Sequence, residues 1–183
     1  LTDSDGTTSL SYEIEKWDSV NQLATVWVKV PQINIESSTD NIYIYFGNSG
    51  ASDAQNKTDV WDSSFVGVYH LKEDPSGVSP QTIDSTTNAN NGSSVGGMTT
   101  GDVVNGQIGY ALDFDGNDAV VVPNHASLSG MSYLTQEAWV YMRSFAGTPV
   151  VMGKNNSYDL YINTGGTLLS DYKSANGGIV PLN

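Results

Sequence analysis

Three carboxylates fall within six positions of a single turn. Asp113, Asp115 and Asp118 surround Gly116 and Asn117 in the middle of the chain. Carboxylate and amide oxygens are the ligands that Ca²⁺ prefers. Asp and Asn are equally typical of solvated turns, because their side chains bond the nearby backbone. The residues alone therefore leave two readings, a solvated turn or part of an oxygen-rich cation site.

The same turn predicts a β-hairpin. An apolar run at residues 111–114 precedes it, and a β-branched run at residues 120–122 follows it. An Asp-Gly pair between two apolar runs is a strong hairpin signal, since Gly116 adopts positive φ without strain. We expect the two runs to pair with each other.

Aromatic side chains near loops suggest a second kind of chemistry, the binding of sugars. Tryptophan and tyrosine rings stack on the apolar face of a pyranose, and amides bond its hydroxyls. Trp139 lies in the middle of an expected strand and is predicted to be a core residue, whereas Trp17 lies near a turn. For each aromatic residue, packing is the alternative role. The predicted ligand-binding residues are Tyr133, Tyr158, Trp61 and Asn155.

Catalytic chemistry finds less support in the residues. Glycoside hydrolysis needs two carboxyl groups about 5–9.5 Å apart, but Glu13 and Glu15 are expected to be like-charged neighbours on one strand face. His70 and His125 lack a metal-binding spacing, and a single strand histidine is more often a packing residue. No Gly-x-Ser-x-Gly and no phosphate-binding loop occurs. No catalytic residue is predicted, and whether the chain is an enzyme stays open, with the balance toward no.

Composition limits the partners. Seven Lys and Arg against 20 Asp and Glu give a net charge of −13, which repels phosphate backbones and argues against nucleic acid. There is no cysteine, so disulfides and thiolate metal sites are excluded. No run of 18 apolar residues occurs, so no membrane span is expected.

The chain reads as many short strands separated by turn signals, which is typical of an antiparallel β-sandwich or jelly roll. No amphipathic window of helical period reaches about 12 residues. A long polar stretch, residues 73–104, is expected to be a functional or ligand-ordered loop. The expected strands are residues 9–15, 23–30, 42–46, 65–71, 133–141, 148–152, 157–162 and 167–172.

From Val68 onward the chain resembles the concanavalin A-like, laminin-G-like domains of bacterial or archaeal extracellular proteins. The residues that carry this resemblance are Val68-Tyr69-His70-Leu71, Asp84-Ser85-Thr86 with Asn90-Asn91-Gly92, Gly109-Tyr110-Ala111-Leu112-Asp113-Phe114-Asp115-Gly116, and Leu134-Thr135-Gln136-Glu137-Ala138-Trp139-Val140. Residues 1–66 resemble the second half of an uncharacterised domain that often precedes such a module. This part is carried by Leu10 to Glu15, Val26 to Pro31 and Ile42 to Asn48.

The resemblance implies an all-β fold, a concanavalin A-like jelly roll at residues 65–183 with an antiparallel β segment at residues 1–64. It also implies a structural Ca²⁺ beside the long loop, with Asp84, Asn91, Asp115 and Asp118 as matching ligands. The expected function is non-catalytic recognition of a polysaccharide or glycan, outside the cell or on its surface. Relative to both families, strands are missing at each end of the chain, so we expect open sheet edges that favour self-association.

Two alternatives come from other functional classes. Enzymes of this fold, hydrolases or lyases, act on polysaccharides, although the Glu-x-Asp-x-x-Glu motif of related glucanases is absent here. A structural adhesion or assembly module would bind neither sugar nor small ligand. Glycan binding without turnover separates the expected function from both.

Overall fold

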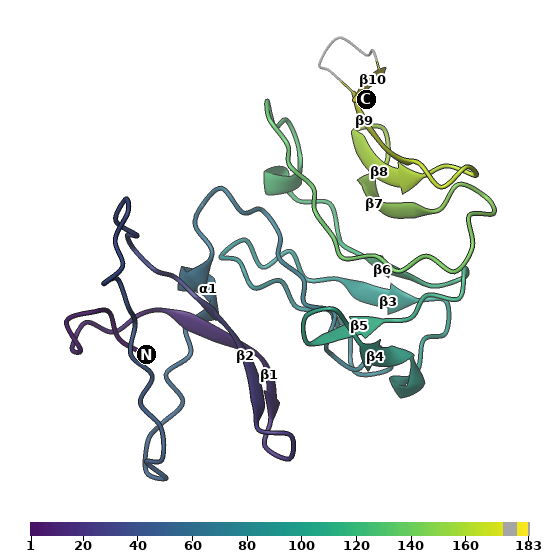
Figure 1. The fold of residues 1–183 in the computed structure, drawn as a ribbon. Helices are drawn as coiled ribbons and strands as arrows, with labels where there is room; N and C mark the ends of the chain where they lie inside the picture. Colours follow the sequence, from purple (N-terminus) through teal and green to yellow (C-terminus); the bar gives the residue numbers. More distant parts are fainter. Residues whose placement is uncertain (174–178, 183) are drawn as a thin grey trace. The chain divides into compact units, whose positions relative to one another are not determined.

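The computed structural model describes residues 1–173 and 179–182 (Figure 1). The described chain is mostly β, with small antiparallel sheets and little helix, so the prediction of an all-β chain is confirmed at this level. A sandwich or jelly roll stays a prediction. Two compact units are present, residues 1–123 and a second unit from Asn124 onward. The predicted domain boundary at residues 64 and 65 stays a prediction.

The first unit begins with an antiparallel pair, β1 (Tyr12–Asp18) and β2 (Leu23–Val28). Alternation along β1 buries Glu13 and Glu15 on one face, where Trp27 of β2 lies opposite Glu13. A β-bulge between Ile14 and Lys16 leaves Glu15 without a partner in the ladder. Two carboxylates and an indole thus share one face of this sheet.

Two more two-stranded sheets follow: β3 (Ser93–Val95) pairs with β6 (Ala119–Val121), and β4 (Val103–Asn105) pairs with β5 (Tyr110–Leu112). The predicted hairpin is therefore wrong, because β5 and β6 each pair with an earlier strand. The turn between them does form, with Gly116 at φ 105°. Turn chemistry is local, whereas β6 takes its partner β3 from more than 20 residues earlier, and β5 pairs with its neighbour β4 instead. The helical segments are short: α1 (Lys57–Val60), η1 (Thr100–Asp102) and η2 (Ala126–Leu128).

The loop at residues 82–92 is organised around the buried carboxylate of Asp84. Asp84 Oδ1 accepts hydrogen bonds from the backbone N–H groups of Val68 (3.0 Å) and Thr86 (2.9 Å). Its Oδ2 accepts from the Thr86 hydroxyl (2.8 Å) and the Asn90 N–H (2.9 Å). Asn91 completes the loop by accepting from the Asp84 N–H at 2.9 Å. The loop is therefore packed by its own polar side chains against residues 65–69.

The second unit contains one antiparallel sheet in the order β10-β9-β8-β7 (Figure 1). Its strands are β7 (Val150–Lys154), β8 (Tyr158–Ile162), β9 (Leu168–Lys173) and β10 (Ile179–Leu182). The predicted strands at 148–152, 157–162 and 167–172 are confirmed within two residues. So is the turn between β8 and β9, where Asn163 accepts from the Gly166 N–H. Within the described ranges, no helix is long and apolar enough to cross a bilayer.

Three predicted strands do not form. Residues 42–46 make one bridge, Tyr43 to Thr2, and residues 65–71 make one bridge, Tyr69 to Asp84. Residues 133–141 are extended without ladder pairing. Trp139 in this segment is 75% exposed, so its prediction as a core residue is wrong. Period-2 patterns mark chain that can form a strand, but a strand also needs a partner.

We predict that Asp84→Asn destabilises the first unit by about 3 kcal/mol, because an amide nitrogen would face donors that now bond a buried carboxylate. Urea denaturation of the full chain, in calcium and in EDTA, measures this. Asp115→Asn is the control, since Asp115 accepts one exposed backbone bond, and we expect it to cost under about 1 kcal/mol. The prediction would be contradicted if both variants lost the same free energy of unfolding in calcium and neither lost any in EDTA. Asp84 would then stabilise the unit by binding calcium and not through the hydrogen bonds of the loop.

Candidate functional site

His70 lies between two glutamates of β1 in the interior of the first unit. Its Nε2 lies 3.1 Å from Glu13 Oε2, and its Nδ1 contacts Glu15 Oε2. The side chains of His70, Glu13 and Glu15 expose 7%, 6% and 2% of their surface. Because both ring nitrogens face carboxylates, the imidazole is held as an imidazolium that donates on both sides.

Three further donors surround this ion triplet. The indole N–H of Trp27 donates to Glu15 (3.0 Å) and that of Trp61 donates to Glu13 (3.2 Å). The Ser85 hydroxyl donates to the other oxygen of Glu13 at 2.7 Å. The rings of Trp27 and Trp61 pack with centroids 5.3 Å apart, and each lies 6.1 Å from the His70 ring. We call these six residues the His70 cluster: Glu13, Glu15, Trp27, Trp61, His70 and Ser85.

The pKa values follow from this arrangement. Burial would raise the pKa of Glu13, but hydrogen bonds from His70 and Ser85 and the charge of His70 outweigh it and lower the pKa to about 2. The pKa of Glu15 is lowered in the same way, against burial, by its hydrogen bond and charge interaction with His70. Burial would lower the pKa of His70, but its bonds to both glutamates raise it to about 9.

The chemistry of the His70 cluster is structural. At neutral pH His70 has no free lone pair, so it cannot act as a general base. Glu13 has both oxygens bonded, and Glu15 has one buried oxygen without a partner, Oε1. Among the described residues, no three His, Asp or Glu side chains are placed to hold one metal ion. The cluster ties β1 to the segment around His70 and to the loop at Ser85.

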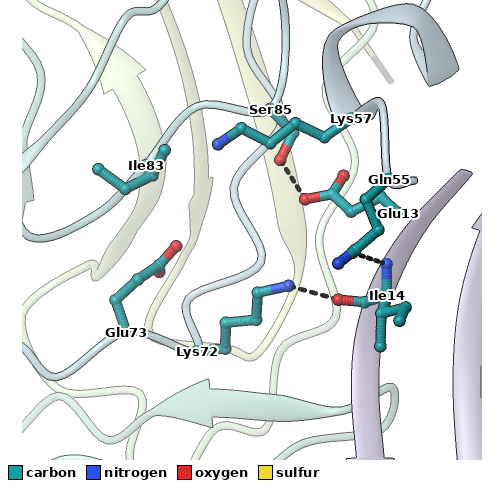
Figure 2. A pocket seen from close by; sticks show the side chains of 8 residues that line it. All are labelled: Glu13, Ile14, Gln55, Lys57, Lys72, Glu73, Ile83 and Ser85. Atoms are coloured by element: carbon teal, nitrogen blue, oxygen red, sulfur yellow. Dashed lines mark hydrogen bonds between the residues drawn. The ribbon is translucent and has the colours of Figure 1, made fainter. Parts of the chain in front are cut away.

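A pocket of about 510 Å³ opens beside the His70 cluster (Figure 2). We call it the lysine pocket, because Lys57 of α1 and Lys72 lie on two of its sides. Lys72 Nζ donates to the Ile14 carbonyl at 2.9 Å, and the Ile14 N–H donates to Gln55 Oε1 at 2.6 Å. The lining residues are Glu13, Ile14, Gln55, Lys57, Lys72, Glu73, Ile83 and Ser85.

A second pocket, of about 480 Å³, lies in the second unit. We call it the Trp139 pocket. It is formed by the extended segment at residues 136–140 and by one face of the β7-β8-β9 sheet. Gln136 lines it, and Gln136 Oε1 has no solvent contact and no hydrogen-bond partner in the described chain. The lining residues are Gln136, Glu137, Ala138, Trp139, Val140, Val151, Leu160, Ile162 and Leu168.

The predicted calcium ligands fall at two places. Asp84 and Asn91 lie together in the loop at residues 82–92, where the oxygens of Asp84 already accept four hydrogen bonds. Asp115 and Asp118 lie in the turn before β6, where Asp118 Oδ2 accepts from the Asp115 N–H at 3.1 Å. A calcium site formed by these residues stays a prediction.

The predicted sugar-binding residues are also divided between the units. Trp61 belongs to the His70 cluster, where its ring packs and its N–H is bonded. Tyr133 is 94% exposed, and Asn155 is exposed in the turn after β7. Tyr158 is half-buried, and its hydroxyl donates to the Leu128 carbonyl at 3.4 Å. Ligand binding by these four residues stays a prediction.

Sequence reasoning missed His70 as the partner of the two glutamates. The signal was present: Glu13 and Glu15 alternate with apolar Ile14, and a buried pair of like charges needs a cation. The sequence did not show which cation, because 55 residues separate Glu15 from His70. The lysine pocket had no signal at all, since its residues come from four separate segments.

The comparisons with known proteins give one match. Residues 1–77 match a domain of unknown function, DUF2341. No laminin-G-like or concanavalin A-like family is matched, so that resemblance stays a prediction. No curated protein and no solved structure matches the chain. The match supports the expectation of an uncharacterised domain at the start of the chain and leaves its function open.

We predict that the first unit is most stable between about pH 4.5 and 6.5. The pKa of His70 is raised from 6.5 to about 9, so its stabilisation is complete below 6.5 and is lost as the pH rises toward 9. The pKa of Glu13 is lowered from 4.5 to about 2, so its stabilisation is complete above 4.5 and is lost as the pH falls toward 2. Denaturant midpoints measured across this range test the profile.

We predict that His70→Gln costs about 3–5 kcal/mol at pH 6, because it leaves a buried carboxylate without its counter-ion. It should also remove the loss of stability between pH 6.5 and 9. His125→Gln is the matched control: His125 is exposed and caps η2 through Ser127, so its cost should stay near 1 kcal/mol or below. If the stability of His70→Gln still fell between pH 6.5 and 9 as in the unmodified chain, His70 would not be the group responsible for that loss.

Proposed function

We propose that the chain is a non-catalytic carbohydrate-binding module and that the glycan binds in the Trp139 pocket. The observation that carries this proposal is an exposed tryptophan on the wall of a pocket that also holds an unpartnered amide oxygen. A ring that is 75% exposed is open to a ligand, and a stacked pyranose ring would cover its apolar face.

The groups of the pocket match the two faces of a sugar. The indole of Trp139 and the apolar side chains of the sheet offer contact to C–H groups. Gln136 Oε1 has no solvent contact, so the amide would turn toward the pocket, where its oxygen would accept a hydrogen bond from a sugar hydroxyl and no longer be unpaired. The exposed carboxylate of Glu137 is a second acceptor at the rim.

Exposed aromatic residues also precede and follow the lining residues of the pocket in the sequence. Tyr133 is 94% exposed and Tyr141 is 91% exposed. Rings at successive places along one segment suit a chain of sugars better than a single monosaccharide. The net charge of −13 favours a neutral polymer, because a polyanion would be repelled.

The finer fold and the location are part of the proposal. The chain from Val68 onward resembles laminin-G-like jelly rolls of exported proteins, and the four short antiparallel strands β7 to β10 are compatible with part of such a sheet. We place the module outside the cell or on its surface for the same reason.

We predict that the purified chain is retained by at least one neutral polysaccharide and that Trp139→Ala weakens retention about tenfold or more. Affinity electrophoresis in gels containing cellulose derivatives, xylan, mannan or β-glucan measures this. Trp17→Ala is the matched control, because Trp17 is 68% exposed but lines neither pocket. Equal loss in both variants, or no retention on any polymer, would overturn the proposal.

The same samples separate binding from catalysis. Release of reducing ends during incubation would assign the chain to the polysaccharide-active enzymes instead. Retention that disappears in EDTA would show that a calcium ion supports the site.

A further inference from the structure

The lysine pocket holds two ammonium groups that are only partly used by the described residues. Lys57 makes no hydrogen bond and no ion pair with any described residue. Lys72 makes one hydrogen bond, to the Ile14 carbonyl, which leaves two of its three donors available. Its charge also helps to lower the pKa of Glu15, but Lys72 forms no direct ion pair with a described carboxylate.

The carboxylate of Glu73 is the complementary group. Glu73 Oε2 has no contact with solvent and no hydrogen-bond partner in the part of the chain that the structure describes. An unpaired buried carboxylate oxygen is costly, so a donor is expected to reach it. In Figure 2 Glu73 and Ile83 lie on one side of the pocket, with Lys57 and Lys72 above and below.

The other polar groups of the pocket are already engaged. Glu13 is neutralised by His70 and bonded by Ser85. Gln55 accepts from the Ile14 N–H and donates to Asp53 at 3.0 Å. Two ammonium groups, one carboxylate oxygen and the apolar side chains of Ile14 and Ile83 therefore remain for a ligand.

Two lysines in one pocket are notable in this chain, because only seven Lys and Arg occur in 183 residues. The same lining contains Glu13 and Glu73, and the charge of Glu13 is balanced by His70. An anion would therefore be attracted at the two ammonium groups and repelled at Glu73, which favours a ligand that also presents a donor to Glu73. A volume of about 510 Å³ is within the range of sites for small organic molecules.

We propose that the lysine pocket binds a small organic carboxylate that carries a hydrogen-bond donor near its acid group. The carboxylate would lie between Lys57 and Lys72, the donor would bond the carboxylate of Glu73, which turns so that Oε2 faces the pocket, and the carbon skeleton would contact Ile14 and Ile83. A hexuronic acid and a free amino acid share this chemistry. The site belongs to the first unit and is independent of the Trp139 pocket and of the glycan proposed there.

Isothermal titration of the full chain with four probes tests the proposal: D-glucuronate, D-glucose, glycine and acetate. We expect glucuronate or glycine to bind with a Kd of about 1 mM or tighter, and glucose at least about tenfold more weakly. Tighter binding of glucuronate assigns an acidic sugar, and tighter binding of glycine assigns an amino acid. Absence of binding by both overturns the proposal.

Variants distinguish the site from general attraction. Lys57→Gln keeps most of the aliphatic stem and removes the charge. It should weaken the binding of the preferred carboxylate ligand about fivefold to tenfold. Lys29→Gln is the matched control, because Lys29 is exposed and does not line the pocket. Equal weakening in both variants would show non-specific attraction and overturn the site. Circular dichroism of each variant confirms that it is folded.

Glu73→Gln tests the second half of the site. It should weaken the binding of the ligand that carries a donor about threefold or more. Acetate has no such donor, so it should bind equally well or more tightly once the negative charge of Glu73 is gone. Weakening of acetate to the same extent would show that Glu73 supports the fold of the pocket instead of contacting the donor.

Discussion

The first unit depends on one interaction, the imidazolium of His70 held between Glu13 and Glu15. Two carboxylates on one face of β1 cannot stay ionised in a protein interior without a cation, because the loss of hydration would exceed any gain from packing. His70 supplies that cation, and Trp27, Trp61 and Ser85 supply the remaining donors. Most of the buried side chains described in this unit are polar, so hydrogen-bond geometry decides its structure as much as apolar contact does.

This balance explains which features the sequence predicts. The β1–β2 pair and the strands β7, β8 and β9 show alternation and turn signals within a few residues, and they form as expected. The turn at Gly116 also forms as predicted, but the predicted pairing of β5 with β6 is wrong. β5 pairs with β4 across a short connection that the prediction missed, whereas β6 pairs with the distant β3. The β3–β6 pairing, like the contact of His70 with β1, joins residues far apart in sequence, and no local pattern encodes it.

The candidate sites also divide into residues with a local sequence signal and residues that meet only through contacts distant in sequence. Tyr133 could be chosen from its place beside a loop, and it is exposed. Trp61 has the same local context, but its N–H is committed to Glu13, a residue 48 positions earlier. The lysine pocket and the Trp139 pocket each join a loop or extended segment to a strand, so their groups become neighbours only in the folded chain. In our proposals each unit therefore binds its own ligand, an organic carboxylate in the lysine pocket and a neutral glycan in the Trp139 pocket.

The hydrogen bond from Ser85 to Glu13 crosses the end of the region that matches DUF2341. The match ends at residue 77, yet the loop that covers Glu13 begins after it, and Asp84 anchors this loop to Val68 within the match. A fragment that ends at residue 77 would contain His70, Glu13 and Glu15 but not the loop that carries Ser85. Water would then reach the carboxylate of Glu13, which is buried in the intact chain. For expression and crystallisation, the natural cut in this chain is therefore near Pro123, where the first compact unit ends.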